Sequence, residues 1–261
     1  MCGIAGFSLD PASRVDRTLA AQALLAGIAE RGADAVGYAH RSASAEVRLH
    51  KQRTGATALL DEVDLPCEAG EALVHVREFT KGHPSLLANN HPIRHGAIVG
   101  IHNGRIANDE EIFGRYGIAR AEPGMTVDSE AIFALMHRSG SARAALQELR
   151  GSMAAAWIDE RVPGRLYLAR GVARPLWIGR ARRELFFAST KSALEVVEGA
   201  LRLTLRKHEV AEGRLLHLER GRIAAEARFH PDRCYAGGTP VPPAAPHERA
   251  SCLARLAVLA A

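Results

Sequence analysis

Short apolar or alternating segments, separated by glycine, asparagine or proline, recur along most of this 261-residue chain. They have the pattern of β-strands and lie at residues 3–9, 35–40, 47–51, 72–76, 97–101, 153–158, 166–169, 176–178, 185–188, 214–218 and 222–228. Helical patterns are grouped between these runs, at residues 15–28, 128–136, 144–149 and 192–197, and Asn108 with Glu111 resembles a capping box. Strands in runs with helices between them predict an α+β domain in which helices cover antiparallel sheets.

The composition favours a folded protein outside the membrane. Hydrophobic residues make up 47% of the chain, enough for a substantial core. No apolar run approaches the roughly 20 residues that span a bilayer. The N-terminus also lacks the basic and apolar regions of a signal peptide, so we expect a cytoplasmic location and no membrane partner.

Neither cysteines nor histidines have the spacing of a metal site. The cysteines form no CxxC pair, which excludes a zinc ribbon and a disulfide framework; they are Cys2, Cys67, Cys234 and Cys252. The histidines of the first half lack paired helical spacing; they are His75, His83, His91, His95 and His102. Phosphate-binding and dinucleotide-binding glycine motifs are absent too, so we predict no metal and no cofactor.

The positive charge of the chain does not indicate nucleic-acid binding. The formal net charge is +5, but the basic residues are scattered and aromatic residues make up only 5% of the chain. One cluster stands out near a predicted hairpin and is expected to be a solvated turn; it contains Arg174, Arg180, Arg182 and Arg183.

The composition changes near the C-terminus. From Pro231 the chain becomes rich in glycine and proline, as in a linker, and it ends in an apolar segment at residues 253–259. We therefore predict a domain over residues 2–228, followed by a linker and short C-terminal segment over 229–261. That segment is expected to form a terminal helix on its own domain, with docking on a partner as the alternative.

The first residues, Met1 and Cys2, suggest a nucleophile. Removal of Met1, which the small second residue favours, would leave Cys2 with both a thiol and a free amine. The amine titrates near pH 7.7–8.0 and the thiol at about pH 8.5, so the amine can accept the thiol proton near neutral pH. Taken alone, a cysteine at the start of an apolar strand is more often a small buried residue.

Several further segments accompany Cys2 in a fixed order. They are Arg31-Gly32 with Asp34 and Gly37, His75-Val76-Arg77 with Thr80 and Gly82, Asn90-His91-Pro92, His102-Asn103-Gly104, and Asp128-Ser129-Glu130. In order, type and spacing they resemble the glutamine amidotransferase domain of the class II, N-terminal-nucleophile hydrolases over roughly residues 2–228, closest to the hexosamine-forming and purine-pathway members. This resemblance implies a four-layer αββα sandwich.

The resemblance also implies the reaction and its catalytic residues. The Cys2 thiolate would attack the carboxamide of glutamine and form a thioester, which water hydrolyses to glutamate after ammonia leaves. The Asn103 amide and the Gly104 N–H would stabilise the oxyanion. Without Cys2, Asn103-Gly104 would be interpreted as a type I′ hairpin turn.

The remaining members of the motifs are implied to bind the substrate. Arg77 would pair with the α-carboxylate of glutamine, and Asp128 would accept hydrogen bonds from its ammonium group. Thr80 and Gly82 resemble a loop that closes over the substrate, and Arg31 resembles an arginine that braces the site from beneath. The alternatives are a helix N-cap for Asp128 and ordinary turn or surface roles for the others.

Two positions depart from the family pattern. Glu78 replaces a residue that is commonly aromatic, and Lys81 replaces the histidine of the hexosamine enzymes. Both lie in the loop that would close over the substrate. We therefore expect water exclusion, or contact with a synthase partner, to differ in this chain.

The leading hypothesis is a glutaminase that hydrolyses L-glutamine and passes ammonia to an acceptor synthase. Only about 30 residues follow the predicted domain, too few for a second core, so the synthase is expected to be a separate subunit. One alternative is an amidohydrolase of the same class acting on another amide or a γ-glutamyl compound. Another is a catalytically idle regulatory or scaffold subunit.

Overall fold

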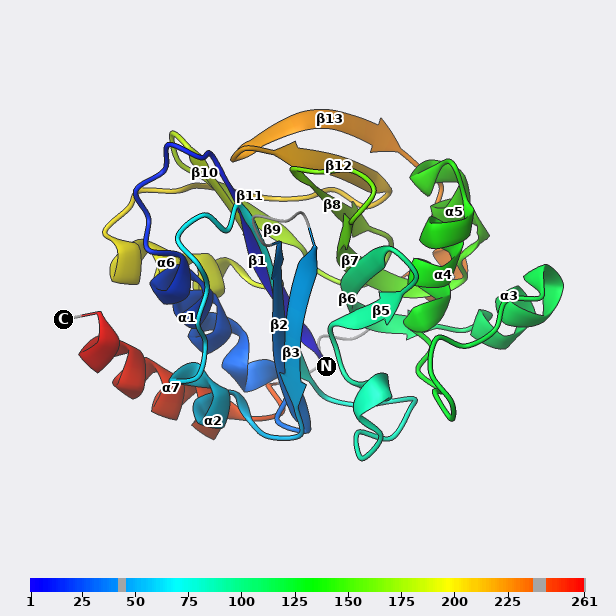
Figure 1. Ribbon diagram of the computed structural model, residues 1–261, viewed down its shortest axis with the longest axis horizontal. Helices are drawn as coiled ribbons and strands as arrows, with labels where there is room; N and C mark the ends of the chain where they lie inside the picture. Colours follow the sequence, from blue (N-terminus) through cyan, green and yellow to red (C-terminus); the bar gives the residue numbers. More distant parts are fainter. Residues whose placement is uncertain (42–45, 237–242, 261) are drawn as a thin grey trace.

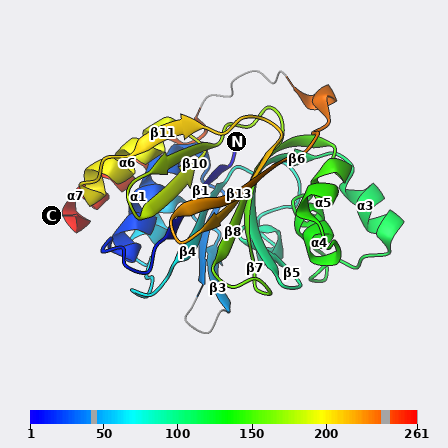
Figure 2. The ribbon, with the colours of Figure 1, turned by 90° about the horizontal axis from the view of Figure 1, so that it is seen from above.

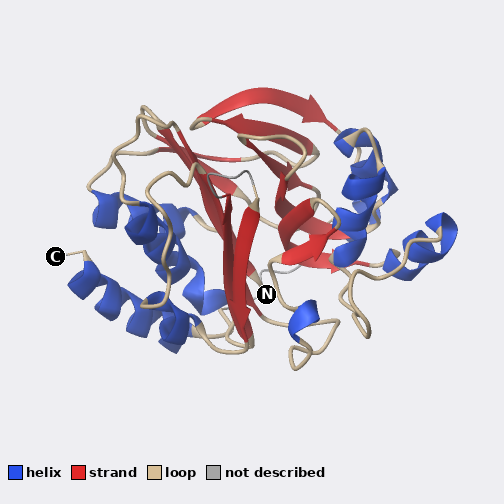
Figure 3. Ribbon diagram, viewed as in Figure 1, coloured by secondary structure: helices blue, strands red, loops and turns tan. Residues whose placement is uncertain are grey.

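The computed structural model describes residues 1–41, 46–236 and 243–260. Two antiparallel β-sheets face each other at the centre of the molecule, and helices cover the outer face of each sheet (Figures 1 and 3). The predicted four-layer α+β fold is confirmed. Residues 237–242, which belong to the predicted linker, lie outside the described part of the chain.

The first sheet carries the N-terminal strand near its centre. Its seven strands are, in spatial order, β11 (Arg206–Glu209), β9 (Trp177–Arg180), β10 (Glu184–Ala188), β1 (Gly3–Leu9), β4 (Glu71–Arg77), β2 (Ala35–Arg41) and β3 (Val47–Gln52). Strand β1 pairs with β4 so that Gly3 lies opposite Val76. Cys2, one residue before β1, is therefore placed at the end of β4, next to Arg77.

The second sheet contains six strands. In spatial order they are β13 (Arg222–Arg228), β12 (Arg214–Glu219), β8 (Arg165–Arg170), β7 (Gly151–Asp159), β6 (Ile98–Ile106) and β5 (Ile93–His95). Strand β6 extends beyond the predicted residues 97–101 because it pairs with β7 along its whole length. The extension places Asn103 and Gly104 inside the sheet.

The helices form two groups. The first sheet is covered by α1 (Arg17–Ile28), α2 (Ala56–Leu60), α6 (Lys191–Leu201) and α7 (Pro246–Leu259), and the second by α4 (Glu130–Arg138) and α5 (Ala142–Glu148). Helix α3 (Asp109–Tyr116) packs beside α4 at the edge of the molecule. Short 3₁₀ turns lie at Ala29–Arg31, Leu87–Asn89 and Arg233–Tyr235. Within the described ranges, no helix has the length and apolar character that crossing a membrane requires.

The core follows the alternation of side chains along the strands. In β1, Ala5 and Phe7 pack with α1, whereas Ile4 packs between the two sheets. A third apolar cluster lies between the second sheet and its helices. Even-numbered side chains near the N-terminus therefore face the space between the sheets.

The capping box predicted at the start of α3 does not form. The Asn108 side chain does not cap α3; its amide donates to the Glu148 carbonyl and accepts from the Arg150 N–H, which connects α3 to the end of α5.

The C-terminal helix α7 packs against α1, and its Cys252 is fully buried. The domain boundary at residue 228 stays a prediction.

Candidate active site

The N-terminus lies between the two sheets (Figures 1 and 2). The Cys2 sulfur is 3.4 Å from the Glu78 carbonyl oxygen, to which the thiol donates. The Arg31 guanidinium donates from Nε to the Cys2 carbonyl at 2.9 Å. Cys2 is thus held between the 3₁₀ turn after α1 and the loop after β4.

A small cavity of about 10 Å³ lies beside Cys2. The predicted site residues that line it are Cys2, Arg77, Thr80, Gly104 and Asp128. They come from four parts of the chain that the two sheets bring together: the start of β1, the end of β4 with its loop, β6, and the segment before α4. Gly82, Asn103 and Arg31 border these residues without lining the cavity.

Arg77 is buried at the end of β4, and the loop that follows wraps around its guanidinium. Nη2 donates to the Lys81 carbonyl at 2.9 Å and also to the Gly82 carbonyl. Nη1 donates to the side-chain oxygen of Asn90. These contacts fix the direction of the guanidinium, and Asn90 has a role that the sequence did not reveal beyond its presence in a motif.

Asp128 is buried and lies two residues before α4. Its carboxylate accepts from the Ile106 N–H at 2.6 Å, at the end of β6. The N-cap position of α4 belongs to Ser129, so the interpretation of Asp128 as an N-cap is wrong. Burial raises the pKa of Asp128, and the hydrogen bond from Ile106 opposes that shift.

Asn103 and Gly104 are paired with β7, opposite Ala154 and Met153, so the type I′ turn is wrong. Gly104 has a φ of 146°, and a Cβ there would lie 2.0 Å from the Ser152 carbonyl oxygen. Only glycine fits this position. Both polar atoms of the buried Asn103 amide lack a hydrogen-bond partner in the described part of the protein, a condition typical of sites that bind a ligand.

Comparison with known proteins relates this arrangement to a family. Residues 83–196 match the glutamine amidotransferase domain family. The chain is 32% identical over 206 residues to glutamine–fructose-6-phosphate aminotransferase of Photorhabdus laumondii and 33% identical over 212 residues to that of Methanothermobacter thermautotrophicus. Each match covers 74% of this chain, and 32% and 34% of the relative. The chain carries a class II glutamine amidotransferase domain.

Solved structures agree with this fold assignment. The glutamine phosphoribosylpyrophosphate amidotransferase of Bacillus subtilis superposes with a TM-score of 0.68 at 21% identity, over 87% of this chain and 49% of that one. A class II glutamine aminotransferase domain protein of Silicibacter pomeroyi superposes with a TM-score of 0.55 at 20% identity, over 88% of this chain and 100% of that one. The chain spans about a third of the length of the curated relatives.

The Cys2 thiol is desolvated. Burial raises the pKa of the Cys2 thiol, although the Glu78 carbonyl and the Arg77 charge act in the opposite direction. Burial also lowers the pKa of the N-terminal amine, which in this structure belongs to Met1. The Cys2 thiol is therefore protonated near neutral pH.

Three neutral histidines lie beneath the cavity of the amidotransferase domain. The His75 and His91 rings stack 4.1 Å apart, and His75 Nε2 lies 3.2 Å from the His102 carbonyl on the other sheet. Burial lowers the pKa of His75 and of His102 to about 3, and that of His91 well below its usual value. Among the described residues, no group of three or more His, Cys, Asp or Glu is arranged to hold a metal ion.

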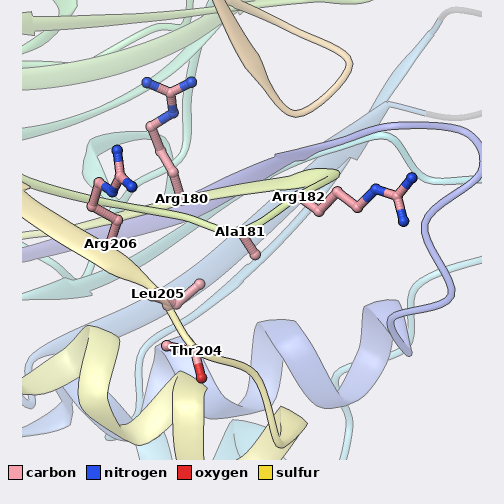
Figure 4. A pocket seen from close by; sticks show the side chains of 6 residues that line it. All are labelled: Arg180, Ala181, Arg182, Thr204, Leu205 and Arg206. Carbon is pink, nitrogen blue, oxygen red and sulfur yellow. The ribbon is translucent and has the colours of Figure 1, made fainter.

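The arginine cluster of the sequence is divided in the structure. Arg180 and Arg182 lie at the turn between β9 and β10, beside a cavity of about 460 Å³ that contains no predicted site residue. Figure 4 shows Arg180 and Arg206 projecting to the same side of the sheet and Arg182 pointing away from them. The expected solvated turn therefore applies to Arg180 and Arg182, whose side chains are exposed.

Arg174 belongs instead to the surroundings of the N-terminus. Besides burial, the Arg31 and Arg174 charges lower the pKa of the N-terminal amine. A bridge between Ser152 and Val172 holds this segment against the start of β7. Nothing in the local sequence distinguishes Arg174 from the arginines that follow, so its place beside the N-terminus could not be predicted from the sequence.

Proposed function

We propose that this protein hydrolyses L-glutamine to glutamate and ammonia through a thioester on Cys2, after removal of Met1. The observation that carries the proposal is the convergence of Cys2, Arg77, Gly104 and Asp128, which come from separate segments, on one cavity. The match to the glutamine amidotransferase domain family supports glutamine hydrolysis as the class of reaction.

The reaction starts at the processed N-terminus. The free amine of Cys2 takes the thiol proton, and the thiolate attacks the side-chain carbonyl carbon of glutamine. The tetrahedral intermediate collapses when the amine returns the proton to the leaving nitrogen, which departs as ammonia. Water, deprotonated by the same amine, then attacks the thioester, releases glutamate and restores the thiol.

The oxyanion of each tetrahedral intermediate requires hydrogen-bond donors. We assign these to the side-chain amide of Asn103, which has no partner among the described residues, and to the Gly104 N–H. The rigid β6–β7 pairing fixes both positions before the substrate binds. Loss of one such donor typically costs about 3 kcal/mol, or roughly a hundredfold in rate.

The amino-acid end of glutamine is proposed to bind on the other side of the cavity. Arg77 pairs with the α-carboxylate and Asp128 accepts from the α-ammonium group. Thr80 and Gly82 belong to the loop over the substrate, and Arg31 braces Cys2 through its carbonyl oxygen.

Ammonia is proposed to pass to an acceptor held by a synthase domain or subunit. The curated relatives are about three times as long as the matched region, and they are named for transfer to fructose 6-phosphate. A separate synthase subunit and a cytoplasmic location stay predictions for this protein.

The chemistry is tested by measuring glutamate and ammonia released from glutamine by the purified protein. We expect Cys2→Ala to abolish release and Cys67→Ala, which alters an exposed cysteine, to leave it unchanged. Intact mass spectrometry of the active protein should show that Met1 is absent. Equal turnover in the wild-type protein and Cys2→Ala would contradict the proposal.

A further inference from the structure

The loop of residues 78–82 forms one wall of the cavity. Its Glu78 carbonyl accepts from the Cys2 thiol, and its Lys81 and Gly82 carbonyls accept from Arg77. The remaining cavity of about 10 Å³ holds at most one water molecule. Glutamine is many times larger than this space, and residues 78–81 of the loop line it.

Arg77, Thr80, Lys81 and Asp128 form the wall where the amino-acid end of glutamine is proposed to bind. Thr80 and Lys81 of this wall belong to the loop. The contacts that hold the loop in place therefore affect the access of glutamine to Cys2.

The loop is fastened near both ends by side chains from other elements. At one end, the Phe79 N–H donates to the Asp34 carboxylate at 2.9 Å. At the other end, the Lys81 ammonium lies 2.5 Å from the Asp109 carboxylate and 3.3 Å from that of Glu110, at the start of α3. Lys81 is thus the only residue of the loop, as described, whose side chain forms an ion pair with α3.

The ion pair is partly protected from water. The Asp109 side chain is only 4% exposed, and that of Lys81 is 32% exposed. The Arg120 guanidinium also contacts the Asp109 and Glu110 carboxylates, at 3.4 and 2.8 Å. Both carboxylates therefore stay paired with Arg120 when the Lys81 side chain moves away. Partial burial lowers the pKa of Lys81, but Asp109 and Glu110 outweigh it and raise that pKa overall, so Lys81 is charged near neutral pH.

We propose that Lys81 is a positioning residue that ties the substrate loop to α3 and thereby limits the access of glutamine to Cys2. The proposal rests on the proposed function and adds a regulatory feature specific to this chain. If only the open loop admits substrate, the apparent dissociation constant of glutamine is its intrinsic value divided by the open fraction. Weakening the ion pair between Lys81 and α3 raises the fraction of molecules with an open loop. It therefore lowers KM for glutamine more than it changes kcat.

The direct test measures alkylation of Cys2 by iodoacetamide without glutamine, followed by peptide mass spectrometry with exposed Cys67 as internal reference. We expect Lys81→Met to accelerate alkylation of Cys2 about fivefold, the upper range for a partly exposed ion pair. Lys81→Arg, which keeps the charge, should stay near the wild-type rate. The control is Arg115→Met, which removes an exposed ion pair with Glu111 within α3.

Asp109→Asn provides a second route to the same result. It should also accelerate alkylation, and the double variant with Lys81→Met should add little, because both substitutions remove the same contact. In steady-state assays, KM for glutamine should fall about as much as alkylation rises. Unchanged or slower alkylation in Lys81→Met, or a higher KM, would overturn the proposal.

The two proposals fail separately. Alkylation of Cys2 requires no turnover of glutamine. Faster alkylation in Lys81→Met, together with no glutamine hydrolysis in any variant, would support the proposed role of Lys81 and contradict the proposed function. Normal glutamine hydrolysis with equal alkylation rates in Lys81→Met and Arg115→Met would support the proposed function and contradict the role of Lys81.

Discussion

At the scale of single residues, burial and geometry decide which polar side chains remain available for a substrate. Asn103 is buried with its amide unpaired in the described structure, whereas Arg77 is buried with a guanidinium already oriented by the loop and Asn90. A buried guanidinium beside a cavity is suited to a carboxylate. The anchoring role of Arg77 can therefore be tested separately from the nucleophile.

We expect Arg77→Lys to lower kcat/KM for glutamine roughly ten- to a hundredfold, because a charged hydrogen bond is worth about 1.5–3 kcal/mol and lysine cannot replace the planar pair. Steady-state kinetics measure the effect, and circular dichroism verifies folding. Arg255→Lys, at an exposed pair with Asp61, is the control. Unchanged kinetics in Arg77→Lys would favour an amidohydrolase that does not bind a free amino acid.

At the scale of secondary-structure elements, β6 determines the geometry of the site. The sequence predicted a strand that ends at residue 101, because Asn103-Gly104 has the signature of a tight turn. In the structure, pairing with β7 carries the strand on to Ile106. The positive φ of Gly104 is accommodated inside the strand, which a local pattern cannot show.

Gly104→Ala should lower the free energy of unfolding by about 1–3 kcal/mol, because the new Cβ would meet the Ser152 carbonyl and the backbone would be strained. Urea unfolding gives the value. Gly114→Ala is the matched control, since nothing lies within 4 Å of a Cβ there and alanine favours a helix. A Gly104→Ala protein as stable as the wild type would show that β6 relaxes around the substitution.

At the scale of the whole molecule, neutral histidines join the two sheets beneath the site. His75 from the first sheet meets the His102 carbonyl of the second. The unfolded chain takes up protons on His75 and His102 below about pH 6.5, but the folded protein does so only near pH 3. The free energy of unfolding therefore falls as the pH falls through this range.

Each such histidine contributes a loss of about 1.4 kcal/mol between roughly pH 7.5 and pH 5.5. We expect His75→Gln to reduce the acid-induced loss by about that amount, measured by urea unfolding at both pH values. His230→Gln, at an exposed position, controls for the substitution itself. An identical loss in His75→Gln and the wild-type protein would mean that His75 is protonated in the folded state.

The sequence by itself indicated the α+β class, because strand and helix periodicity are local properties, and its ordered motifs, through their resemblance to a known family, supplied the candidate residues. Only the tertiary structure decided which residues meet. It separated Arg174 from the hairpin arginines, placed Asp128 in contact with the end of β6, and paired Lys81 with α3. These contacts join residues far apart along the chain, and their partners are fixed by the register of two facing sheets, which no local pattern encodes.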